Sequence, residues 1–156
     1  MFDDVLTRDN EIAHITSSAF VVNKNRSKAL MVHHNISNSW SWAHADGDVD
    51  LLYVANKEVK EETGIQNIKP VDQNILSLDI LPVLGHTKKG KYIAPHLHIS
   101  VAYLLEGDEN ETLVVKPDEN SSVQWIPFRE INMYSNESHM KVIYNKIISK
   151  IEKSSI

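Results

Sequence analysis

The sequence contains no cysteine among its 156 residues. This absence excludes disulfide bonds, zinc–thiolate sites and a cysteine nucleophile. No apolar run approaches the roughly 18 residues that a membrane-spanning helix requires, so no membrane partner is expected. Positive charge is not in excess either, because the net charge is −5. The chain therefore lacks the general attraction to double-stranded nucleic acid that a basic protein has.

The chain opens with Met1-Phe2-Asp3-Asp4, which places acids before any apolar stretch. A secretory signal has the opposite order, with basic residues before an apolar segment, so we expect a cytoplasmic protein. Hydrophobic residues make up 42% of the chain and charged residues 24%, as in soluble globular proteins. The sequence has no repeat or linker, and its length suits one hydrophobic core. We predict a single domain over residues 1–156.

The order of predicted elements indicates a mixed α+β fold. Apolar and β-branched runs between polar turns predict strands, and apolar residues at helical spacing predict helices. The predicted helices cover residues 51–63 and 136–153, and the predicted strands cover residues 15–22, 28–34, 67–71, 75–84, 93–105, 112–116 and 123–128. Residues 43–50 are predicted to be a small-residue, acidic loop before the first helix. Strands in the middle with helices beside them are typical of a layered α+β domain.

Three carboxylates, those of Glu58, Glu61 and Glu62, fall within five residues of the first predicted helix. On a helix their side chains point into one sector, because residues three and four apart are neighbours. Carboxylates that close repel one another, and a hard divalent cation with its preference for oxygen ligands would offset the repulsion. The alternative is an ordinary solvated helix face, which mixed charge runs usually form.

The segment from Ala43 to Ile65 resembles the signature of the Nudix hydrolases. That signature reads Gly, five residues, Glu, seven residues, Arg-Glu, an apolar residue, any residue, Glu-Glu, any residue, Gly and an apolar residue. Six of its nine fixed positions match here, namely Glu58, Val59, Glu61, Glu62, Gly64 and Ile65. The first three differ, because Ala43 replaces the Gly, Val49 the first Glu and Lys57 the Arg.

The resemblance implies a Nudix fold, an α/β/α sandwich with a mixed central sheet. It also implies hydrolysis of a diphosphate linkage in a nucleoside diphosphate joined to a further moiety X, with Mg²⁺ or Mn²⁺ as cofactor. X could complete a nucleotide sugar, ADP-ribose, a dinucleotide or a nucleoside triphosphate. Many members of the family dimerise, so a homodimer stays open.

The resemblance also assigns roles to residues. Glu58, Glu61 and Glu62 are expected to hold the metal, with the backbone carbonyl of Trp42 as a further ligand. Glu58 and Glu61 are also candidates for the catalytic carboxylates. A late acid often acts as base or extra ligand in the family, and its place shortly before Trp125 favours Glu119. The competing late acids are Asp118, Glu106, Asp108, Glu109 and Glu111.

The departures from the signature lead to an alternative function. In the family the first Glu and the Arg are thought to support each other and to orient the catalytic acids. Lys57 cannot reproduce the planar, two-point hydrogen bonding of Arg, so it either pairs with Asp46, Asp48 or Asp50 or leaves the site less rigid. The alternative is therefore a catalytically weak nucleotide-binding or regulatory module. An isoprenoid diphosphate isomerase of the same fold is disfavoured, because those enzymes use a cysteine.

Histidines form a second group of candidate residues. His96 and His98 alternate on one face of a predicted strand, and together with His86 they could bind a transition metal or contact substrate phosphate. A polar sheet face that lines a cleft is the plainer interpretation of the same pattern. His44 lies within the signature loop, where a structural or substrate contact is expected, and Lys57 is a further candidate substrate contact.

Overall fold

The computed structural model describes residues 12–35, 39–46 and 50–154, and of residues 44–46 it describes the backbone. Seven strands form one sheet with the order β3-β2-β1-β8-β5, in which β4 also pairs with β1 and β9 with β2. The strands of this sheet are β1 (Ala13–Val22), β2 (Lys28–His34), β3 (Ser39–Ser41), β4 (Ala43–Asp46), β5 (Ile68–Val83), β8 (His96–Gly107) and β9 (Asn120–Pro127). The helical elements are α1 (Leu51–Thr63), η1 (Phe128–Glu130), α2 (Ile131–Tyr134) and α3 (Ser138–Lys153).

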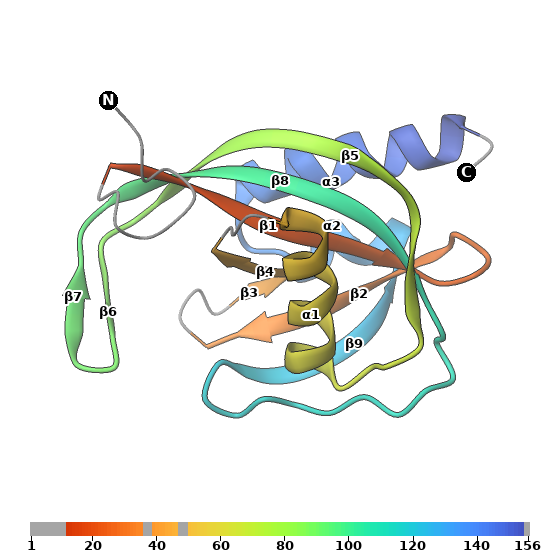
Figure 1. The fold of residues 1–156 in the computed structure, drawn as a ribbon, viewed down its shortest axis with the longest axis horizontal. Helices are drawn as coiled ribbons and strands as arrows, with labels where there is room; N and C mark the ends of the chain where they lie inside the picture. Colours follow the sequence, from red (N-terminus) through yellow and green to blue (C-terminus); the bar gives the residue numbers. More distant parts are fainter. Residues whose placement is uncertain (1–11, 36–38, 47–49, 155–156) are drawn as a thin grey trace.

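The helices α1 and α3 cover opposite faces of the sheet (Figure 1). Side chains alternate along β1, so that Val21 packs with Ala55 of α1, whereas Phe20 packs with Ile147 of α3. The alternation follows from the two-residue period of a strand. The predicted α+β sandwich is therefore confirmed, with one hydrophobic core on each side of a mixed sheet.

The centre of the sheet brings together segments that are far apart in the sequence. Strands β1 and β8 run parallel over the whole length of β1, from Ala13 opposite Leu97 to Val22 opposite Glu106. Strand β2 returns antiparallel beside β1 after a turn at residues 23–27. In that turn the Asn23 side chain accepts the backbone N–H groups of residues 27 and 28 at 2.9 and 3.0 Å.

Several predicted strand boundaries are wrong. Residues 68–83 form one long strand with register irregularities between Pro70 and Ser77, not two strands, because each part pairs with β8. Residues 112–116 are not a strand, since Val114 donates its N–H to the carbonyl of Thr63 at the end of α1. Residues 43–46 pair with β1 and so form a strand, where a loop was predicted.

A short ribbon projects beyond the sheet (Figure 1). It consists of β6 (His86–Lys88) and β7 (Lys91–Ile93), which are joined by Lys89 and Gly90, both with positive φ. Positive φ at both central residues matches the right-handed twist of the two strands. In the described ranges, no helix is long and apolar enough to cross a membrane.

Candidate active site

Helix α1 begins at a side-chain cap and ends at a backbone cap. The Asp50 carboxylate accepts the Tyr53 N–H at 2.9 Å, which satisfies one of the free donors at the N-terminus. At the other end Gly64 has φ +76°, and its N–H donates to the carbonyl of Lys60 at 3.0 Å. A left-handed glycine in this place ends a helix without steric cost. The cap residues therefore fix where the carboxylates of α1 lie.

Three carboxylates meet between α1 and the segment before β9. Carboxylate oxygens of Glu58, Glu62 and Glu119, one from each residue, lie within 4.8 Å of one another. Glu58 and Glu62 are one helical turn apart, and Glu62 is only 1% exposed. Backbone contacts bring Glu119 into place. Its neighbour Asn120 donates from Nδ2 to the carbonyl of Glu62 at 3.2 Å, and the carbonyl of Glu119 accepts the N–H of Asn35 at 3.0 Å.

The cluster concentrates negative charge in a poorly solvated place. Burial, together with the adjacent Glu58 and with Glu119, raises the pKa of Glu62 to about 9. Burial also raises the pKa of Glu58, against a lowering by its hydrogen bond to Glu62. Oε2 of Glu62 is buried and has no hydrogen-bond partner among the described residues. Buried carboxylates so arranged need a proton or a cation, and a hard divalent cation such as Mg²⁺ or Mn²⁺ fits their oxygen donors.

Lys116 adds a positive charge that sequence reasoning missed. Its Nζ lies 3.3 Å from Oε1 of Glu119, and its charge lowers the pKa of both Glu58 and Glu62. Burial alone would lower the pKa of Lys116, but the attraction of Glu119 and the hydrogen bond to it raise the pKa overall. The available signal was the three-residue spacing to Glu119 within a polar turn.

Glu61 and Lys57 lie at the exposed edge of the same helix. The Glu61 side chain is 46% exposed, and its Oε1 is 3.7 Å from Nζ of Lys57. Glu61 is outside the group of three meeting carboxylates, but its charge raises the pKa of Glu58. Lys57 thus has Glu61 as its partner, while the Asp50 carboxylate caps the helix. The Asp46 side chain, Asp48 and Val49 lie outside the described residues.

The segment that leads into the start of the signature is anchored to α3. The Trp42 side chain is buried, and the backbone N–H of Trp42 donates to the Tyr144 hydroxyl at 3.3 Å. Its carbonyl oxygen lies 3.5 Å from Oγ of Ser41, and its role as a metal ligand stays a prediction. Ala43 is buried in the core beneath α1. The side chain of His44 lies outside the described part of the chain.

The predicted histidine pair is on the other face of the sheet. Ser18 and Ser100 contact each other at 3.2 Å, and Phe20, two residues after Ser18, packs against Tyr144 of α3. By the same alternation His96 and His98 belong to the α3 side. They meet His14 rather than the predicted His86, whose Nδ1 lies 2.9 Å from the carbonyl of Leu84. Their role as substrate contacts stays a prediction.

Comparison with known proteins identifies the family. The family model of the NUDIX domain matches residues 13–147, which is most of the chain. The chain therefore belongs to the Nudix family, and the predicted class of enzyme, a Nudix-type pyrophosphohydrolase, is confirmed. None of the curated protein sequences matches the chain.

Solved structures with low sequence identity share the fold. A binary complex of the Ap4A hydrolase of C. elegans has a TM-score of 0.65 at 14% identity, with 90% of this chain and 98% of that chain covered. A NUDIX family hydrolase of Clostridium perfringens has a TM-score of 0.61 at 16% identity, covering 88% and 97%. The NUDIX domain of Shewanella oneidensis NrtR, in complex with ADP ribose, has a TM-score of 0.60 at 12% identity, covering 88% and 87%.

Proposed function

We propose that this protein hydrolyses a diphosphate linkage in a nucleoside diphosphate joined to a moiety X, with Mg²⁺ or Mn²⁺ as cofactor. Glu58, Glu62 and Glu119 hold the cation. The observation that carries the proposal is the buried Oε2 of Glu62, which has no partner among the described residues and lies beside two further carboxylates. Burying an oxygen atom without a partner costs free energy, and a cation bound at the site would offset that cost.

When bound, the cation would neutralise phosphoryl charge and lower the pKa of a bound water. The exposure of the residues around the cation indicates which of them act as ligands and which accept a proton. Glu62, the most buried, serves as a ligand only. Glu61 is exposed and next to the cluster, so its carboxylate is placed to accept a proton from the attacking water, with Glu58 as the second candidate. The ammonium of Lys116 beside Glu119 can draw the substrate phosphates toward the cluster.

The proposed ligand set extends to the backbone. The carbonyl of Trp42 is proposed as a further ligand, held in place by the anchoring of Trp42 to Tyr144. His44 and Lys57 remain proposed substrate contacts. The class of X is left to a panel of dinucleotides, nucleotide sugars, ADP-ribose and nucleoside triphosphates. Ap4A and ADP ribose, named for two structural neighbours, come first in that panel.

A second candidate function is nucleotide binding with little or no turnover. The observation that favours it is the ion pair of Lys57 with Glu61, which engages a proposed proton acceptor. Tight nucleotide binding without turnover in either metal would support this module. Steady multiple turnover would exclude it.

The test measures release of phosphate or nucleoside monophosphate from the panel, with Mg²⁺ and Mn²⁺ in parallel. We expect Glu62→Gln and Glu58→Gln to reduce turnover on the order of 10²-fold or more, the scale of a lost catalytic group. Glu152→Gln, an exposed change on α3 across the sheet, is the matched control and should retain full turnover. If turnover of every active substrate survives both Glu58→Gln and Glu62→Gln, the proposed metal site is wrong.

A further inference from the structure

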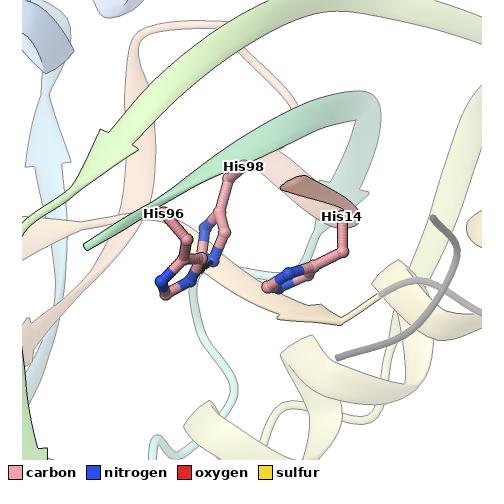
Figure 2. A group of neighbouring side chains, drawn as sticks. All are labelled: His14, His96 and His98. Atoms are coloured by element: carbon pink, nitrogen blue, oxygen red, sulfur yellow. Dashed lines mark hydrogen bonds between the residues drawn. The ribbon is translucent and has the colours of Figure 1, made fainter. Parts of the chain in front are cut away.

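Three histidines meet where β1 and β8 begin (Figure 2). His14 and His98 are direct register partners on these parallel strands, and His96 precedes His98 by two residues on the same face. One ring nitrogen from each residue lies within 4.8 Å of the others. The three rings pack as a unit, with centroids 4.8 to 5.1 Å apart. Three imidazoles therefore present nitrogen atoms to one small volume.

The spacing of the donor atoms fits a transition metal. Nε2 of His96 and Nε2 of His98 are 3.1 Å apart. Zinc–nitrogen bonds of about 2.0–2.1 Å in tetrahedral geometry place two ligand nitrogens roughly 3.3 Å apart. The pair thus needs only a small adjustment to bind one ion. His14 is the buried member, at 4% exposed, and its ring stacks on that of His96.

A backbone carbonyl fixes which nitrogen of His96 is available. Nδ1 of His96 lies 2.9 Å from the carbonyl oxygen of Ala94. A carbonyl only accepts hydrogen bonds, so Nδ1 must carry the proton, and Nε2 of the neutral ring keeps its lone pair. Metal-binding histidines are usually oriented in this way, by donation from the other ring nitrogen. His96 is therefore prepared as an Nε2 ligand and directs that nitrogen at His98.

A simple hydrogen bond between His96 and His98 would explain only that pair. It leaves unexplained why a third imidazole, from a strand distant in sequence, is buried against both rings. From the three converging rings, we infer that His14, His96 and His98 form a binding site for a transition-metal dication of the Zn²⁺ type. Imidazole ligands select such ions over Mg²⁺, which prefers oxygen. His96 and His98 are half-buried, so their exposed side leaves a fourth ligand position for water or another small ligand.

This site is separate from the proposed catalytic centre, because the two lie on opposite faces of the sheet. A bound ion would join the start of β1 to the start of β8, and it would stabilise the folded chain because the unfolded chain has no such site. The inference does not depend on the proposed function, since neither Glu58 nor Glu62 takes part.

The test uses untagged full-length protein carrying Glu62→Gln, so that the acidic cluster is weakened as a competing site. Co²⁺ is titrated as a spectroscopic probe, and Zn²⁺ binding is measured by calorimetry. We expect one equivalent of Co²⁺ with visible bands typical of nitrogen ligation, displaced by Zn²⁺. Zn²⁺ should also raise the melting temperature. His14→Gln should weaken binding about 10–100-fold or more, whereas His139→Gln, an exposed histidine on α3, should leave it unchanged.

Two results would overturn the inference. One is the absence of stoichiometric Co²⁺ or Zn²⁺ binding by folded protein at micromolar concentration. The other is binding that His14→Gln and His139→Gln affect equally. If His14→Gln does not fold, as judged by circular dichroism, His96→Gln provides the same comparison at a more exposed position. Loss of hydrolysis in Glu62→Gln with retention of Co²⁺ binding would show that the two sites are independent of each other.

Discussion

Glu62 is the residue whose environment departs most from that of an ordinary glutamate. Its pKa is raised from 4.5 to about 9, so in metal-free protein it stays protonated in the folded state while the unfolded chain ionises. Stability from this group is fully present below pH 4.5 and is lost as pH rises toward 9. We expect the free energy of unfolding to fall over this range by up to about 1.4 kcal/mol per pH unit.

Glu62→Gln should remove most of this slope, because glutamine does not ionise. Urea unfolding in EDTA at several pH values between 5 and 9 measures the effect, with Glu152→Gln as the control that keeps the slope. Adding Mg²⁺ should flatten the wild-type curve, since the cation replaces the proton, and should leave Glu62→Gln unchanged. Equal slopes in wild type and Glu62→Gln would show that Glu62 is not buried as described.

Lys116 would compete with a divalent cation for Glu119 if the proposed metal site is occupied. Its Nζ is 3.3 Å from that carboxylate and would be repelled by an ion bound among the three acids. We expect Lys116→Met to strengthen Mn²⁺ binding by roughly three- to tenfold, because an unfavourable charge pair is removed. Manganese titration by electron paramagnetic resonance measures the change. Lys153→Met, at the exposed end of α3, is the control. Weaker binding in Lys116→Met would indicate that the ammonium organises Glu119 instead.

At the scale of the element, Gly64 ends α1 and, having no side chain, leaves room for the segment that carries Glu119. A Cβ at Gly64 would lie 2.7 Å from Cβ of Val114, and φ there is +76°. Gly90 has the same φ with open space around it, so Gly90→Ala isolates the backbone cost, roughly 1–2 kcal/mol. We expect Gly64→Ala to cost about 1–3 kcal/mol more, measured by thermal or urea unfolding. Equal losses would mean that the 113–119 segment moves aside freely.

The elements that were predicted well are those with local signals. Helix α1 runs from Leu51 to Thr63, the range that the apolar spacing predicted. Segments whose pairing depends on distant residues were predicted poorly. β5 is continuous only because β8 pairs along its length. Residues 112–116 have strand composition, yet Val114 is held by the end of α1 instead.

The same division applies to the candidate sites. The meeting of the Glu58 and Glu62 carboxylates follows from helical spacing, and the family resemblance predicted Glu119 as the late acid that lies beside them. The prediction that His86 joins His96 and His98 was wrong, because closeness in sequence does not decide which residues meet in the fold. The partner is His14, which the parallel register of β1 and β8 brings opposite His98. No local pattern in the sequence encodes that register.

At the scale of the whole molecule, the sheet separates two cores and two candidate metal sites, and Tyr144 links the two sides. Tyr144 lies on α3, is fully buried, and its hydroxyl accepts the N–H of Trp42 at 3.3 Å. Through this bond α3 can position the Trp42 carbonyl, the proposed backbone ligand across the sheet. Because Tyr144 is buried, water does not easily reach this hydrogen bond as a substitute partner.

Tyr144→Phe removes this one hydroxyl and leaves the Trp42 N–H without the partner it now has on α3. We expect a loss of about 1–2 kcal/mol in the free energy of unfolding and a several-fold weaker Mg²⁺ affinity, because the Trp42 carbonyl is less well held. Ile147→Val is the matched control, since Ile147 is equally buried on α3 and the change costs about 0.5–1.5 kcal/mol without removing the hydrogen bond to Trp42. Its Mg²⁺ affinity should equal that of the wild type. If both variants bind Mg²⁺ like the wild type, α3 supports the fold alone, and the Trp42 carbonyl is either not a ligand or is positioned by β3 and β4.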